Sequence, residues 1–148
     1  EGYPDRGDLR WIDTASEALE DLAELQTLDR ICVENLEGFP EAFWDPLFDR
    51  VPVGRCIDIG HLWVDGLPAV PYLEKRLART RVIHLHGLGS RDHKSLQHMD
   101  RTQVEGVLEV LVRRGYDGVV TLEMFDENDV FGSMRMISGI MEQKEWGN

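Results

Sequence analysis

The sequence predicts an α/β fold built from successive βα units. Four short runs rich in Ile and Val, each bounded by Gly, Pro or a charge, have the composition of buried parallel strands. They lie at 30–34, 54–59, 81–86 and 118–124. The segments between them have the length and apolar spacing of helices, so strands and helices alternate along the chain.

The first predicted helix starts after Asp8, a suitable N-cap, and runs to about Gln26. Its apolar residues recur at helical spacing and are Ile12, Ala15, Leu19, Leu22 and Leu25. A short helix follows the first strand over 41–50. The next helix is predicted over 69–78, with Pro68 and Pro71 near its start, where proline costs least.

A long loop follows the third strand and carries glycines together with charged and histidine side chains. These residues are Gly87, Gly89, Arg91, Asp92, His93 and His98. Loops of this composition are frequently functional. A helix over 102–114 ends at Gly115, and a last helix over 128–142 follows the fourth strand, which gives five helices in all.

Composition limits the classes of function. The 148 residues, 42% hydrophobic and 30% charged, suit one globular domain. A net charge of −12 repels phosphate backbones, so no nucleic-acid partner is expected. No apolar stretch approaches the roughly 20 residues of a membrane span, and no signal-peptide pattern is present, so we expect a cytoplasmic protein without a membrane partner. Cys32 and Cys56 are expected to be reduced structural residues.

Each predicted strand ends in a side chain that can bind a metal: Glu34, Asp58, His84 and Glu123. In βα architectures the carboxyl ends of the strands meet on one side, so these four side chains should converge. Strand parity agrees, because residues two apart face the same way. The same parity turns Cys32, Cys56, Val82 and Thr121 inward, and Ile31, Val33, Ile57, Ile59, Ile83, Leu85, Val120 and Leu122 outward toward helices.

Simpler explanations exist for each site residue. Glu34 and Glu123 could pair with an arginine instead of a cation, since a buried carboxylate needs one or the other. Asp58 could be a helix N-cap, with His61 a hydrogen-bonded polar histidine, and His84 alone could belong to the core. His86 also faces inward and competes with His84 for the ligand role.

The series Glu34, Asp58-Ile-Gly-His61, His84-Leu-His86 and Glu123 resembles the second half of the xylose isomerase-like TIM barrels, which include sugar phosphate isomerases, epimerases and endonuclease IV. The residue sequences of five motifs resemble those of the cobamide-remodelling phosphodiesterases of that superfamily. They are Ile-Cys-Val-Glu-Asn-Leu, Cys-Ile-Asp-Ile-Gly-His-Leu, Thr-Arg-Val-Ile-His-Leu-His-Gly, Arg-Asp-His-Lys-Ser-Leu and Thr-Leu-Glu-Met-Phe. The resemblance implies that residues 1–148 form one segment, the C-terminal half of a (β/α) TIM barrel with four parallel strands and five helices.

The resemblance makes Glu34, Asp58, His84 and Glu123 the ligands of one divalent metal. It also implies that His61 and His93 bind a second metal or contact the substrate. The endonuclease branch has Asp two residues before the loop histidine, whereas this chain has Arg91 there. Three carboxylates and one imidazole suit Mn²⁺, with Co²⁺ or Mg²⁺ as alternatives, and added histidines favour Zn²⁺, so Mn²⁺ or Zn²⁺ is expected.

Three functions follow as hypotheses. The resemblance implies a metal-dependent hydrolase of a cobamide phosphodiester, with Arg91 and Lys94 receiving the phosphate. The alternative is a sugar, or sugar phosphate, isomerase or epimerase in which Glu34 and Glu123 move protons. His61 joins them as a catalytic candidate. Substrate contacts are assigned to His61, His86, Arg91, His93 and Lys94.

The third hypothesis is an inactive half-barrel scaffold. A sheet of four parallel strands leaves its first and last strands unpaired on one side. We therefore expect either the N-terminal half of a barrel or a second copy of the chain, as a dimer, to be a partner besides the small-molecule substrate.

Overall fold

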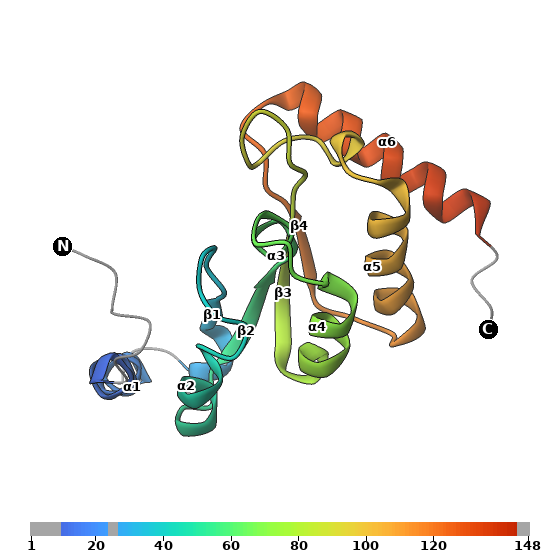
Figure 1. Ribbon diagram of the computed structural model, residues 1–148. Helices are drawn as coiled ribbons and strands as arrows, with labels where there is room; N and C mark the ends of the chain where they lie inside the picture. The colour runs from blue at the N-terminus through green and yellow to red at the C-terminus, as the bar shows by residue number, and fades with distance from the viewer. Residues whose placement is uncertain (1–9, 24–26, 145–148) are drawn as a thin grey trace.

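The computed structural model describes residues 10–23 and 27–144, and Figure 1 shows its arrangement. The sheet has the order β1-β2-β3-β4 with every neighbouring pair parallel. The strands are β1 (Cys32–Glu34), β2 (Gly54–Asp58), β3 (Thr80–Leu85) and β4 (Val119–Leu122). The predicted parallel α/β sheet is therefore confirmed, with the strand order that a half barrel requires.

The described residues contain six α-helices, so the predicted number of five is wrong. They are α1 (Arg10–Ala23), α2 (Asp45–Arg50), α3 (Ile59–Val64), α4 (Ala69–Arg76), α5 (Arg101–Arg113) and α6 (Glu127–Gln143). The missed helix is α3, because the second strand was extended to Ile59 whereas Asp58 already caps the helix. None of the helices described is long and apolar enough to cross a bilayer.

Several predicted boundaries shift by a few residues. β1 starts at Cys32 because Leu28–Arg30 forms a 3-10 turn, and two further 3-10 turns lie at Leu77–Arg79 and Leu96–His98. The predicted cap Asp8 lies outside the described residues, as does Leu25. Leu22 was predicted to belong to the apolar stripe of the first helix, which is wrong because its side chain is 44% exposed.

The core lies between the sheet and the helices α4 and α5, which cover its outer face (Figure 1). Ile57, Ile83 and Leu85 point outward as predicted and are almost completely buried. They pack in one cluster with Leu73 of α4 and Val107 of α5. Burying a side chain of this size contributes about 1.5–3 kcal/mol, so this layer fixes the strands that end at the site.

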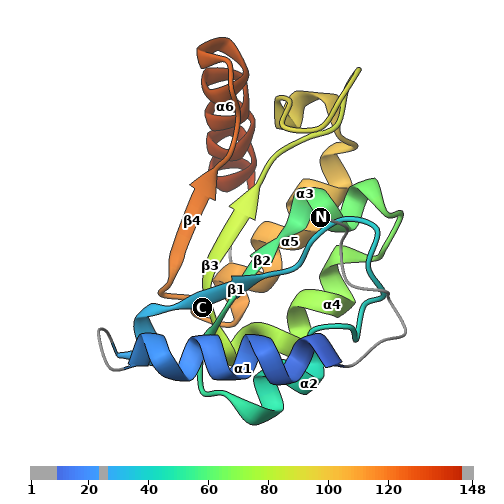
Figure 2. The same cartoon turned by 90° about the vertical axis from the view of Figure 1, so that its left-hand side faces the viewer.

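The edge strand β4 is open. Val119 and Val120 are both exposed. Val120 was predicted to pack against helices, which is wrong because α6 instead packs on the 3-10 turn at 96–98, where Ser133 Oγ accepts the Leu96 amide at 2.9 Å. Figure 2 looks onto the sheet, with α5 behind it and β4 at its edge. The outer side of β4 is therefore uncovered by the described residues.

Candidate metal centre

Four side chains meet at the carboxyl ends of the four strands, as the sequence predicts. Glu34, Asp58, His84 and Glu123 each offer one ligand atom within 4.8 Å of the others. Register causes this, because Asp58 pairs with His84 and the amide of Glu123 donates to Leu85 O at 3.2 Å. The separation is close to the span of one coordination shell with bonds of about 2.1 Å.

The imidazole of His84 lies between two carboxylates. Its Nδ1 is 3.1 Å from Glu34 Oε1 and 2.9 Å from Glu123 Oε2. Burial raises the pKa of Glu34 above its ordinary value; His84 partly opposes the rise, and the charge of Asp58 adds to it. A divalent cation bound among these carboxylates would offset the repulsion between their negative charges.

Asp58 uses its two carboxylate oxygens differently. Oδ1 accepts the backbone amide of His61 at 2.9 Å, which caps α3. Oδ2 is buried without a hydrogen-bond partner among the described residues and lies 3.9 Å from His84 Nδ1. Burial raises the pKa of Asp58, but contacts with His86 and His61 outweigh it and the net pKa is lowered. An ionised, buried oxygen without a donor fits a metal ligand.

Asn35 fixes the position of Asp58 and was missed by sequence reasoning. Its side-chain amide donates to Asp58 O at 3.0 Å, and its Oδ1 accepts the Asp58 amide at 2.9 Å. Because Asn35 follows Glu34, this buried pair of hydrogen bonds locks the ends of β1 and β2 together. A polar residue directly after the first predicted strand was the available signal.

Three histidines form a second group beside the carboxylates. His61, His86 and His93 also offer ligand atoms within 4.8 Å of one another. The Nδ1 of His61 lies 2.9 Å from Asn35 O, and His93 Nε2 lies 3.9 Å from Glu123 Oε2. The structure thus brings together His61 and His93, the predicted pair for a second metal or for substrate.

His84, and not its rival His86, belongs to the carboxylate cluster. His86 is 0% exposed, and its ring lies against Gly60, where an added Cβ would be 2.1 Å from Nε2. The ring of His93 also stacks on the His86 ring, with centroids 4.1 Å apart. His86 was predicted to contact substrate, but it is enclosed by the protein.

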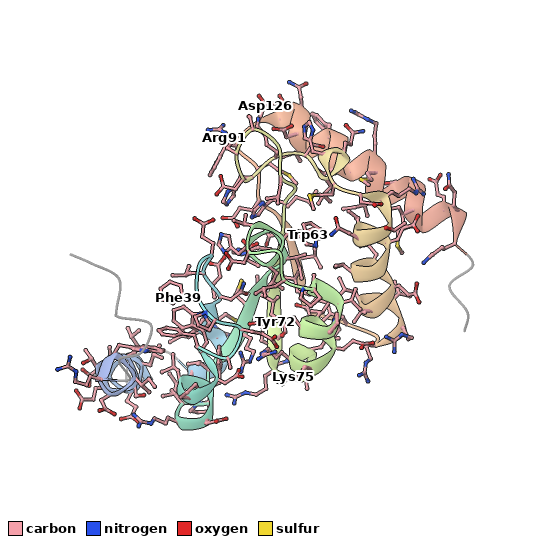
Figure 3. The ribbon with its side chains drawn as sticks, in the orientation of Figure 1. Phe39, Trp63, Tyr72, Lys75, Arg91 and Asp126 are labelled. Carbon is pink, nitrogen blue, oxygen red and sulfur yellow. The ribbon has the colours of Figure 1, made fainter. Side chains whose placement is uncertain are left out.

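The loop after β3 positions the remaining candidates, with Arg91 and Asp126 labelled near the carboxyl ends of β3 and β4 in Figure 3. Arg91 is exposed and lies 5.9 Å from the ring centroid of Phe125. The ammonium of Lys94 is 3.0 Å from Asp129 Oδ2 and ties the loop to α6. Lys94, predicted to receive a phosphate, thus already has an anionic partner.

Phe125 was also missed by sequence reasoning. It is 72% exposed and stacks on the ring of His93 with centroids 4.9 Å apart. It follows Glu123 by two residues, in the motif Thr-Leu-Glu-Met-Phe, so its distance from a ligand candidate was the available signal. Phe125 places an exposed aromatic ring at the rim of the site.

The cysteines lie beneath the site, where they were predicted to be structural. Both are free thiols. Burial raises the pKa of Cys56 far above its ordinary value, and the charges of Glu34 and Asp58 add to the rise. The Sγ atom of Cys56 is also within 4.8 Å of ligand atoms of Glu34 and His84.

Comparison with solved structures gives two relatives of the fold. A D-tagatose 3-epimerase-like protein matches with a TM-score of 0.72 at 22% identity, over 88% of this chain and 53% of that one. The apo form of 3-keto-D-glucoside 4-epimerase, YcjR, from E. coli matches with a TM-score of 0.54 at 13% identity, over 88% and 52%. The chain thus spans about half the length of these structures.

No curated protein matches the chain significantly. The model of the xylose isomerase-like TIM barrel family matches residues 2–146, almost the whole sequence. Four parallel strands in sequential order, with candidate site residues at their carboxyl ends, agree with that match. The chain belongs to the xylose isomerase-like TIM barrel family.

Proposed function

We propose that this chain carries the metal-binding half of a sugar, or sugar phosphate, isomerase or epimerase. The observation that carries the proposal is the pair of carboxylates, Glu34 and Glu123, on either side of His84 Nδ1. Two carboxylates that can transfer protons, placed around one bound cation, suit proton movement next to a substrate carbonyl. Sugar epimerases among the structural neighbours support this choice over phosphodiester hydrolysis.

The residues present fit a divalent ion. Glu34, Asp58, His84 and Glu123 would hold it, and the unpartnered Oδ2 of Asp58 is the strongest sign of the fit. Three carboxylates with one imidazole favour Mn²⁺, with Co²⁺, Mg²⁺ or Zn²⁺ as alternatives. When bound, such an ion polarises a substrate carbonyl and makes the adjacent C–H more acidic.

The protein side chains then move the protons. Glu34 and Glu123 act as base and acid on the carbons that flank the carbonyl. His61 and His93 bind substrate hydroxyls, and the exposed ring of Phe125 closes one side of the site.

Solvent exchange tests the proposal. The Mn²⁺-loaded chain is incubated in D₂O with a panel of pentuloses and hexuloses, and ¹H NMR follows loss of the protons next to the carbonyl. We expect loss that depends on Mn²⁺ and disappears in Glu123→Gln. The control is His98→Asn, an exposed histidine on the 3-10 turn at 96–98, which should exchange like the wild type. No exchange at any ketose would argue against isomerisation.

Phosphodiester hydrolysis remains the second candidate, because Arg91 is exposed at the rim, where an anion can reach it. Hydrolysis of a phosphodiester or of a cobamide by the metal-loaded chain, without ketose exchange, would favour it. Absence of bound metal in every preparation would favour the inactive scaffold.

We also propose how the part of the barrel wall that this chain does not supply is completed. The uncovered residues of β4 and the half-length match support completion by four further βα units, which supply the other wall of the pocket. A second copy of the chain is the alternative, and sedimentation distinguishes the two as a monomer or a dimer.

A further inference from the structure

His86 is wholly enclosed although it follows a strand that ends at the site. Its ring and the Asp58 carboxylate are both 0% exposed, with Nε2 3.3 Å from Asp58 Oδ1. The close approach depends on Gly60, since any Cβ there would overlap the imidazole. A ring in this position acts on a substrate only through the residues around it.

The hydrogen-bond partners of His86 Nδ1 determine that the ring proton lies on Nε2. The backbone N–H of His93 donates to His86 Nδ1 at 3.1 Å. Gly87 O, which accepts the Lys94 amide at 3.0 Å, lies 3.2 Å from the same nitrogen, but a carbonyl oxygen cannot donate to it. An amide can only donate, so in the neutral ring Nδ1 accepts and Nε2 carries the proton that faces Asp58.

The backbone of His93 is arranged for this contact. Its φ is +53°, the one positive φ of a non-glycine residue among those described. Such a conformation is disfavoured for residues with a Cβ and is retained where surrounding contacts enforce it. The stacking of the His93 ring on His86, and of Phe125 on His93, supplies those contacts.

We propose that His86 is a positioning residue, which holds Oδ1 of Asp58 so that Oδ2 is presented to the metal. Oδ1 also accepts the His61 amide at 2.9 Å, and Nε2 of His86 lies 3.3 Å from the same oxygen in a contact that lacks hydrogen-bond geometry. Oδ2 is left buried and unpartnered among the described residues, on the side of His84. The inference rests on the proposed metal centre. Replacing a residue that orients a metal ligand, without itself contacting the metal, typically changes metal affinity about 10–100-fold.

Two variants separate the role of each ring nitrogen. His86→Gln keeps an N–H near the position of Nε2, whereas His86→Asn keeps a polar atom only near Nδ1. We expect Mn²⁺ affinity, measured by calorimetry, to fall about 10–100-fold in His86→Asn and to be largely rescued in His86→Gln. The Mn²⁺ electron paramagnetic resonance spectrum should change in His86→Asn alone. His98→Asn is the matched control with wild-type affinity.

A double-mutant cycle with Asp58→Asn tests whether His86 acts through Asp58. Once Asp58 is replaced, His86→Asn should cause no further loss of Mn²⁺ affinity. Additive losses, equal losses in the Gln and Asn variants, or no loss in either would overturn the proposal. Thermal unfolding of the metal-free variants checks that both fold alike.

Metal-free protein separates this inference from the proposed function. Imidazole ¹⁵N shifts should show His86 with a proton on Nε2 and should change in Asp58→Asn. If wild type binds no Mn²⁺, the metal centre fails and the positioning role fails with it, while the ¹⁵N spectrum still decides which nitrogen of His86 carries the proton. A proton on Nδ1 of His86 would overturn the positioning role even if Mn²⁺ binds.

Discussion

The side chain of Asn35 holds the backbone of Asp58 through two hydrogen bonds, one to its carbonyl and one from its amide. Because both are buried, Asn35→Ala leaves an unpaired donor and acceptor on Asp58. We predict a loss of about 2 kcal/mol in unfolding free energy, measured with urea, and weaker Mn²⁺ binding. The control Asn128→Ala, at an exposed position on α6, should change neither. Unaltered stability would show that the strand ends do not depend on this contact.

Glu34→Gln should separate metal binding from stability. Burial holds the pKa of Glu34 above its ordinary value, so the ionised carboxylate destabilises the metal-free fold at neutral pH. The stabilisation by its neutral form is complete below the unfolded pKa and is lost as pH rises through the folded pKa. At pH 7 the metal-free variant should therefore melt above wild type. Mass spectrometry should find near-stoichiometric metal in wild type and none in the variant; metal retained in both would contradict the site.

Metal affinity should depend on pH in a defined direction. Binding needs Glu34 ionised, and its raised pKa means that protons compete with the metal at pH values above the ordinary 4.5. Mn²⁺ affinity should fall as pH is lowered toward that raised pKa, with proton release on binding. Calorimetry in two buffers with different ionisation enthalpies measures the released protons. Affinity that rises on acidification would exclude Glu34 as a ligand.

Sequence alone could predict the convergence of the four strand-end residues, because parity along a strand and the shared edge of a parallel sheet depend only on local pattern. It could not predict that His86 is enclosed, since this depends on Gly60 and His93, which approach it only in the folded chain. The stacking of Phe125 on His93 joins two loops and has no periodic signature. The exposure of Val120 likewise depends on where α6 packs.

Arg91→Ala should distinguish substrate binding from metal binding. The guanidinium is exposed, lies over the rim residue Phe125 and has no place in the carboxylate cluster. We expect the variant to bind Mn²⁺ like wild type and to lose affinity for an anionic substrate, a sugar phosphate or a phosphodiester. Ligand titrations followed by NMR, with and without Mn²⁺, measure both. Equal loss of metal and substrate binding would count against this role.

A buried ion network away from the site tests how the sheet is supported. Asp45 Oδ1 is 2.7 Å from Arg55 Nη2, and its Oδ2 is 2.9 Å from Arg76 Nη2. The two arginine side chains are only 10% and 3% exposed. Burial alone would raise the pKa of Asp45, but hydrogen bonds from both arginines hold it below its ordinary value.

Asp45→Ala therefore leaves Arg55 without its carboxylate partner in the interior. We predict a loss of about 3 kcal/mol in unfolding free energy, the lower end for a broken buried pair, and a melting temperature about 9 °C lower. Asp49→Ala, an exposed change in the same helix, should stay within about 0.5 kcal/mol of wild type. Because the pKa of Asp45 is lowered, its stabilisation is present above the unfolded pKa and is lost as pH falls through the folded pKa. The difference between wild type and Asp45→Ala, followed by thermal melts, should therefore shrink in acid; a difference constant with pH would mean that packing, and not charge, causes it.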